Sequence, residues 1–179
     1  MTYKKQLVFL LTLISILALF YTFSIVFSYD RSSVKTALYT WLEPETAVRI
    51  NRIVFNTGWE EFELIKRNNQ WFVSHNGGEF PARQARIEDF LNILTARSAW
   101  PVRSANAATH NRFGLGEYAS RLTIYDNFSV LLDLLVGDYD LTGNEAYFRR
   151  AGQNEVRSGD SFILTYMTSP VESWYDVIN

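Results

Sequence analysis

An uncharged apolar segment from Leu7 to Tyr29 constrains this 179-residue chain more than any other feature of its sequence. The segment is 23 residues long, and about 20 apolar residues at a rise of 1.5 Å span a hydrocarbon core roughly 30 Å thick. A cleaved signal peptide is the alternative, because Lys4 and Lys5 precede the segment and Val26-Phe27-Ser28 offers a passable cleavage site. The length and bulk of the segment favour an uncleaved transmembrane helix over residues 7–29.

Basic residues on both sides of this segment predict its orientation. Lys4 and Lys5 precede it, and Arg31 and Lys35 follow it, which gives a modest bias toward a cytoplasmic N-terminus. Residues 1–6 are therefore expected in the cytoplasm and the remainder of the chain outside it.

Small side chains form a stripe on the predicted transmembrane helix, within about 120° of one another at 100° per residue. The stripe consists of Thr12, Ser15, Ala18 and Thr22. Helices in lipid associate through close packing at small residues and through hydroxyl hydrogen bonds. The stripe therefore predicts docking of a second membrane helix, from a partner or from another copy of this chain. The alternative is that the hydroxyl groups bond only to carbonyl groups of their own helix.

The charge and cysteine content of residues 30–179 exclude several classes of function. These residues hold 15 Lys+Arg, since two of the 17 precede the apolar segment, and all 19 Asp+Glu, a formal charge of −4. A mildly acidic domain argues against nucleic acid as a partner and against a polybasic lipid-binding surface. The absence of cysteine excludes disulfides, thiolate catalysis and cysteine–zinc sites.

Residues 30–46 are expected to connect the membrane helix to a domain over residues 47–179. Apolar residues at helical spacing predict that the helix continues until Pro44 ends it; they are Val34, Leu38, Trp41 and Leu42. Tyr39 and Trp41 would then either anchor the chain at the membrane interface or pack against the domain, and we slightly favour packing.

The first half of the domain shows alternating strands followed by a helix. The predicted strands are 48–55, 62–66 and 71–73. Asn68-Asn69 is expected to form a tight turn, because Asn tolerates positive φ. Trp71 is expected to cover the core, although an exposed partner contact is the alternative. Pro81 opens the helix, whose core face is Ile87, Phe90, Leu91 and Leu94.

The second half repeats this order about 70 residues later. The predicted strands are 122–124, 130–136 and 146–149, followed by a short helix over 162–167. Ser169-Pro170-Val171-Glu172 then fits a capping box that begins a last short helix. We therefore expect an α+β fold: an N-terminal transmembrane helix and an antiparallel sheet with a few helices. Two similar β-β-β-α lobes, over 47–103 and 118–179, would follow from an internal duplication.

The sequence shows no catalytic residues, no cofactor motif and no metal-ligand set. Asp138-Tyr139-Asp140-Leu141-Thr142-Gly143 resembles the start of a calcium loop, but Arg149 stands where the bidentate Glu is needed, so we interpret it as an acidic turn. Gly114-Leu115-Gly116 lacks the third glycine of a dinucleotide site and is expected to be a turn. His75 and His110 lie in turn-like segments, which favours surface histidines over a metal pair or a general base.

The order of several short motifs resembles a known bacterial family. The motifs are the strand 50–55, the hairpin ending at Trp71, Pro81-Ala82-Arg83-Gln84-Ala85, Phe113-Gly114-Leu115, Val136-Gly137-Asp138 and Tyr147-Phe148-Arg149. In this order they resemble the domain of unknown function numbered 4340. The chain departs from that pattern at Gly116-Glu117, where the family often has a proline. The resemblance implies a membrane-anchored envelope protein, often encoded beside gliding-type ABC transporter components, and it implies no catalytic residues.

The sequence and this resemblance together predict a function. We expect a non-catalytic accessory or scaffolding subunit of an ABC-transporter-associated cell-envelope complex, which binds a protein partner through its exported domain and its anchor helix. The protein would cross the bacterial inner membrane once, with its C-terminal domain in the periplasm or otherwise outside the cytoplasm. The alternatives are a small envelope hydrolase that uses paired carboxylates and a binder of cell-wall or extracellular polymer. No cofactor is expected, and a homo-oligomer is compatible with the stripe.

Overall fold

The computed structural model of the protein describes residues 12–17, 21 and 38–176. Residues Met1–Thr36 and Ala37–Asn179 form two separate compact units. Within the first unit, residues 12–17 are helical and exposed. Among the described residues, no helix is both long enough and apolar enough to cross a membrane. Most of the segment 7–29, which is predicted to be a transmembrane helix, lies outside the described residues.

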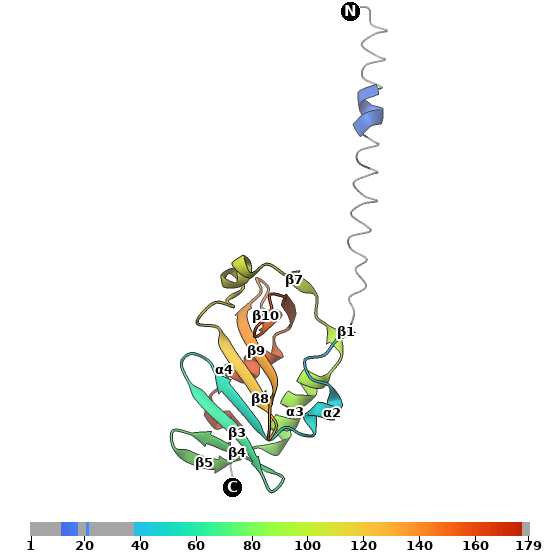
Figure 1. The fold of residues 1–179 in the computed structure, drawn as a ribbon. Helices are drawn as coiled ribbons and strands as arrows, with labels where there is room; N and C mark the ends of the chain where they lie inside the picture. The colour runs from blue at the N-terminus through green and yellow to red at the C-terminus, as the bar shows by residue number, and fades with distance from the viewer. Residues whose placement is uncertain (1–11, 18–20, 22–37, 177–179) are drawn as a thin grey trace, which may run out of the picture. The chain divides into compact units, whose positions relative to one another are not determined.

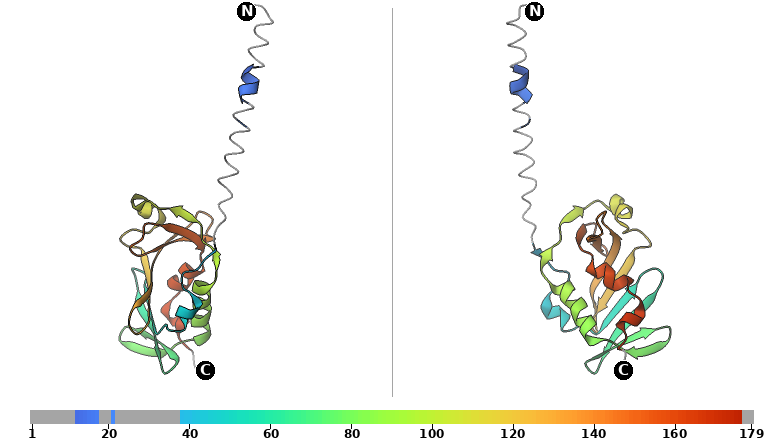
Figure 2. Two further views of the ribbon diagram at one scale, coloured as in Figure 1. Left: turned by 45° about the vertical axis from the view of Figure 1, so that its right-hand side comes forward. Right: turned by 180° about the vertical axis from the view of Figure 1, so that it is seen from behind.

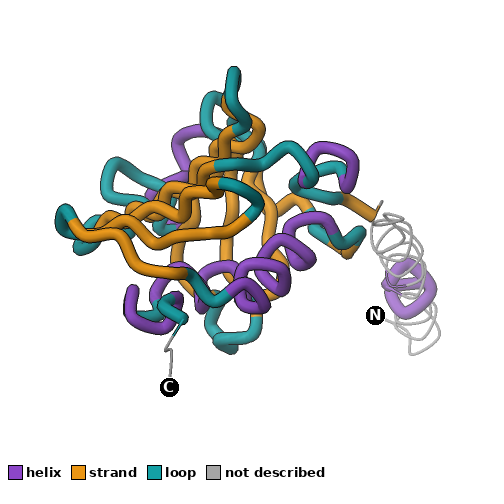
Figure 3. The backbone as a smooth tube through the Cα atoms, turned by 90° about the horizontal axis from the view of Figure 1, so that it is seen from below, coloured by secondary structure: helices purple, strands orange, loops and turns teal. Residues whose placement is uncertain are grey.

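The second unit is built around one antiparallel sheet of nine strands in the order β5-β4-β3-β2-β8-β9-β10-β11-β7 (Figure 1). The strands are β2 (Arg52–Asn56), β3 (Glu61–Arg67), β4 (Gln70–His75), β5 (Gly78–Pro81), β7 (Val102–Ser104), β8 (Ser120–Tyr125), β9 (Val130–Tyr139), β10 (Glu145–Arg150) and β11 (Val156–Asp160). The helical segments are α2 (Pro44–Ala47), α3 (Gln84–Thr95), α4 (Phe162–Thr168) and the 3-10 helices η1 (Ala107–Phe113) and η2 (Val171–Trp174). Figures 2 and 3 show α3 and α4 together on one face of this sheet.

The predicted fold class is therefore wrong. The described chain is mostly antiparallel sheet with few helices, it holds no helix that could cross a membrane, and its two halves are not separate lobes. β2 from the first half pairs with β8 from the second along its whole length, from Arg52↔Tyr125 to Asn56↔Arg121. One sheet with one core follows, because the central strands of the sheet come from both halves.

Along the strands, every second side chain is buried against the helices. On β2, Ile53 and Phe55 are buried, and α3 meets them with Ile87, Phe90 and Leu94. Phe55 stacks on Phe62 of β3, with 4.7 Å between the ring centroids. The predicted core face of this helix is thereby confirmed, except that Leu91 is only half-buried.

The β3–β4 hairpin forms as the sequence predicts. Asn68 and Asn69 adopt φ angles of 50° and 64°, the left-handed conformation that a two-residue hairpin turn requires. Trp71 is 6 % exposed and belongs to the core. The prediction that Trp71 covers the core is confirmed, and its alternative as an exposed contact is excluded.

The connector does not continue as a helix in the part that the structure describes. A short strand β1 (Leu38–Tyr39) pairs with β6 (Ser98–Ala99), and α2 begins at Pro44 rather than ending there. Pro suits the first turn of a helix, where its missing N–H costs nothing. Trp41 is buried, and Arg150 Nε donates a hydrogen bond to the Tyr39 hydroxyl group at 2.9 Å. The prediction that Tyr39 and Trp41 pack against the domain is confirmed.

The chain ends on two short helical segments that cover the sheet. α4 confirms the short helix predicted over 162–167 and buries Ile163, Leu164 and Met167. The predicted capping box does not form: Ser169 Oγ donates to the Thr165 carbonyl oxygen at 2.7 Å, and η2 has no side-chain cap. Trp174 of η2 is fully buried beside Phe55 and Phe90.

Candidate functional site

The Phe113-Gly114-Leu115 and Val136-Gly137-Asp138 motifs contact each other at one end of β9. A Cβ atom on Gly137 would lie 2.0 Å from the carbonyl oxygen of Phe113, so only glycine permits this approach of the two backbones. Gly114 has a φ of 68°, and a Cβ atom there would lie 2.5 Å from Cγ of Asp138. The two glycines therefore let the segment after η1 dock against the sheet.

The Tyr147-Phe148-Arg149 motif contributes to the same junction. The Phe113 ring lies 4.8 Å from the Tyr147 ring, between centroids, and Leu115 is buried. Phe148 points to the opposite face of the sheet and is fully buried. Three separate sequence motifs thus fix the position of residues 114–119. The sequence did not predict that these motifs contact one another.

A hollow of about 460 Å³ lies beside this junction. It is lined by Asn111, Gly114, Gly116, Glu117, Tyr118, Ala119 and Asp138. Tyr118 is 89 % exposed at its rim. The neighbouring β2–β3 turn approaches this segment closely, since a Cβ atom on Gly58 would lie 3.9 Å from the Tyr118 carbonyl oxygen.

Trp59 follows Gly58 in that turn and is 98 % exposed. The turn itself is firmly hydrogen-bonded: Gly58 N donates to Asn56 Oδ1 at 3.0 Å, and Thr57 N donates to the Glu60 carbonyl oxygen at 3.0 Å. The Glu60 carboxylate also lies 3.2 Å from Nε2 of His75. A well-braced turn thus presents a large apolar ring to solvent, and its backbone approaches the segment that carries the exposed Tyr118.

We call this region the aromatic end surface and define it as Trp59, Glu61, Glu117, Tyr118 and Asp138. Within the described residues, none of its three carboxylates forms an ion pair; Glu61 accepts a hydrogen bond from Asn56 Nδ2 at 2.8 Å.

Arg121 of β8, which lies opposite Asn56 in the sheet, binds a different carboxylate. Its Nε donates to Asp133 Oδ1 at 2.8 Å, and this contact raises the pKa of the Arg121 guanidinium. The surface therefore combines apolar rings with uncompensated negative charge.

The sequence analysis missed Trp59, Glu117 and Tyr118. The sequence does contain a signal for them. Gly58-Trp59 and Gly116-Glu117-Tyr118 lie between predicted strands, where the alternation of buried and exposed residues does not apply and an aromatic side chain can be exposed. For Asp138 the sequence suggests a calcium loop or a place in the Val136-Gly137-Asp138 motif, and neither identifies it as part of a surface.

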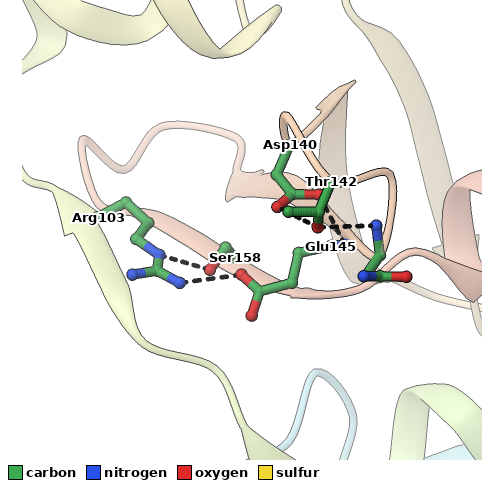
Figure 4. A network of polar contacts seen from close by, with 6 residues as sticks. Arg103, Asp140, Thr142, Glu145 and Ser158 are labelled. Carbon is green, nitrogen blue, oxygen red and sulfur yellow. Dashed lines mark hydrogen bonds and ion pairs between the residues drawn. The ribbon is translucent and has the colours of Figure 1, made fainter.

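The loop after Asp138 is an acidic turn, as predicted, and Figure 4 shows its contacts. Asp140 Oδ2 accepts a hydrogen bond from Thr142 Oγ1 at 2.8 Å, and Asp140 Oδ1 accepts one from the Glu145 backbone N–H at 3.0 Å. These two bonds lower the pKa of the Asp140 carboxyl. Across the strand, Arg103 donates to both Ser158 and Glu145, at 2.7 and 2.9 Å. Each polar group of this network thus has a partner within the fold.

The two histidines lie apart and each has a partner in the protein. His75 ends β4 and pairs with Glu60, and His110 Nε2 lies 3.0 Å from the Asn154 carbonyl oxygen. Among the described residues, no group of three His, Asp or Glu side chains is arranged to hold a metal ion.

A second hollow, of about 520 Å³, lies at the opposite end of the strands around the β8–β9 turn. Asp126 there accepts hydrogen bonds from the backbone N–H groups of Phe128 and Ser129, and the first of these is the main cause of its lowered pKa. Arg52 stacks on Tyr125 with 4.2 Å between its Cζ and the ring centroid. The polar groups of this hollow mostly bind each other, and Phe128 at its rim is 95 % exposed.

Half of the predicted helix-packing stripe falls outside the described residues. Thr12 and Ser15 lie in the described helical stretch 12–17, whereas Ala18 and Thr22 lie outside the described residues. The stripe therefore stays a prediction.

Comparison with known proteins identifies a family. Neither the curated proteins nor the solved structures include a match to this chain. A family model described as "Domain of unknown function (DUF4340)" matches residues 71–176, from β4 to two residues beyond η2. This range contains the motif junction, Glu117, Tyr118 and Asp138. Because the match covers more than half of the chain, the protein belongs to the DUF4340 family.

Proposed function

We propose that this protein is a non-catalytic accessory subunit of an ABC-transporter-associated cell-envelope complex and that it binds a protein partner through the aromatic end surface. The observation that carries the proposal is the exposure of two aromatic side chains, Trp59 and Tyr118, on two turns whose backbones approach each other at Gly58 and the Tyr118 carbonyl oxygen. Trp and Tyr are enriched among the residues that dominate binding energy at protein interfaces. A preordered loop also loses little conformational entropy when it binds.

The transporter part of the proposal rests on the family resemblance. The resemblance implies that the protein is encoded beside a permease and an exported auxiliary subunit of a gliding-type transporter, so these proteins are the expected partners. Location at the inner membrane, with the domain outside the cytoplasm, belongs to the same proposal.

The carboxyl groups give little support to the alternative of a hydrolase with paired carboxylates. A general acid of that type needs a carboxyl whose pKa is raised by burial or by a like charge. In the part of the chain that the structure describes, the carboxyl pKa values with a clear shift are those of Asp126, Asp140 and Glu145, and all three are lowered. For Glu145 the largest cause is the hydrogen bond from Ser158.

The proposal is tested by co-purification of the full chain from its own cells in mild detergent. The transporter permease and auxiliary subunit should co-purify with the parent chain, and Trp59→Ala/Tyr118→Ala should reduce their recovery at least about tenfold, the loss expected for a hot spot worth about 2 kcal/mol or more. Phe128→Ala removes an equally exposed ring at the other end of the sheet and should leave recovery unchanged. Recovery of both subunits at the parental level by the double variant would contradict the proposal. If the parent chain instead sediments with isolated cell wall and Trp59→Ala/Tyr118→Ala does not, the protein is a polymer binder.

A further inference from the structure

The charges around the exposed rings specify the chemistry of the partner. Glu117 and Asp138 both line the hollow next to Tyr118, and Glu61 lies on the strand that follows the Trp59 turn. A third polar group, Asn111, lines the same hollow, and its side-chain oxygen lies beside Gly116, since a Cβ atom on Gly116 would lie 2.3 Å from Asn111 Oδ1. These oxygens are hydrogen-bond acceptors, and among the described residues neither carboxylate forms an ion pair.

The exposed rings favour the same kind of ligand. Lysine and arginine side chains bind to the faces of aromatic rings, and the indole of Trp gives the strongest such contact. The apolar stem of these side chains also covers apolar surface while the charged head remains at the polar rim. A hollow of about 460 Å³ with acceptors on its lining and the Tyr118 ring at its edge has the size and polarity for a long cationic side chain.

We infer that the aromatic end surface binds a basic segment of the partner protein, with a lysine or arginine side chain in the hollow between Tyr118 and Asp138. This inference rests on the proposed function and adds the chemical class of the partner. Carboxylates that stay unpaired in the free domain, while Arg121 is held by Asp133, leave the surface complementary to a cation.

Trp59 provides the measurement, because it is the exposed one of the five tryptophans in the chain. The other four, Trp41, Trp71, Trp100 and Trp174, are at most 6 % exposed. Addition of a capped hexa-arginine peptide at about 0.15 M salt should change the emission of Trp59 saturably, and a capped hexa-glutamate peptide should not. Trp59→Phe should abolish the signal.

Neutral variants separate the site from general electrostatic attraction. Glu117→Gln/Asp138→Asn keeps the side-chain shapes and should weaken peptide binding about tenfold. Glu88→Gln/Asp89→Asn removes the same charge from the exposed side of α3 and should leave binding unchanged. Equal weakening by both pairs, or no saturable change with the parent chain, would overturn the inference.

Co-purification distinguishes this inference from the proposed function. If Glu117→Gln/Asp138→Asn retains the transporter subunits at the parental level while Trp59→Ala/Tyr118→Ala loses them, the inference fails and the proposed function stands. If both double variants retain the subunits, the proposed function itself fails.

Discussion

At the scale of single residues, Gly137 is the glycine at which an added Cβ atom would come closest to a neighbouring backbone atom. Gly137→Ala places a methyl group against the Phe113 carbonyl oxygen, which is backbone and cannot rotate away. We expect a loss of about 1–3 kcal/mol in the free energy of unfolding, as for other overpacked sites. Chemical denaturation measures it. Gly143→Ala is the control, because its Cβ atom meets nothing within 4 Å and only its φ of 75° is unfavourable. A smaller loss at Gly137 than at Gly143 would contradict the docking described here.

At the scale of elements, the turns on either side of β9 are each stabilised by an aspartate. Hydrogen bonds from Phe128 N–H and from Thr142 Oγ1, respectively, lower the pKa of Asp126 and Asp140 below the ordinary value of 3.8. A lowered carboxyl pKa stabilises the fold above 3.8, and this stabilisation disappears as the pH falls through the folded-state value. The difference in the free energy of unfolding between the parent and Asp126→Ala/Asp140→Ala should therefore be constant near neutral pH. This difference should decrease as the pH falls below 3.8.

Urea titrations between about pH 7 and about pH 3 measure this difference. Glu88→Ala, on the exposed side of α3, should show a small difference from the parent that does not depend on pH in this way. A difference for the aspartate pair that stays constant down to about pH 3 would show that these hydrogen bonds do not stabilise the turns.

Local elements followed from the sequence, whereas their partners in the sheet did not. The Asn68-Asn69 turn and the core face of α3 depend on residues a few positions apart, so periodicity and turn chemistry predict them. The β2–β8 pairing joins residues about 70 positions apart, and the repeated strand order suggested two lobes instead. For the site, alternation identified buried side chains but carried no information about Trp59, which is exposed because its turn lies beyond the last strand pair.

At the scale of the whole molecule, one sheet and one core predict one unfolding transition for residues 38–176. β2 and β8 are central strands, so neither half can keep its sheet when the other unfolds. Unfolding in urea, followed by tryptophan fluorescence and by far-ultraviolet circular dichroism, should give coincident curves. Fragments 47–103 and 118–179 should each be unfolded when produced alone. Two separated transitions, or a folded fragment, would restore the interpretation as two lobes.

The short strand β1 also gives the domain a mechanical property. A pull on the chain ahead of Leu38 is resisted first by the two residue pairs with β6, then by the bonds from Trp41 N and Leu42 N to the Leu94 carbonyl oxygen, at 3.1 and 3.0 Å. Arg150 carries part of the same load from Tyr39 into β10. Tension on the connector is therefore borne by the sheet and by the end of α3 before α2 or β2 is strained. The aromatic end surface is built on other strands and turns, so it lies outside this set of contacts.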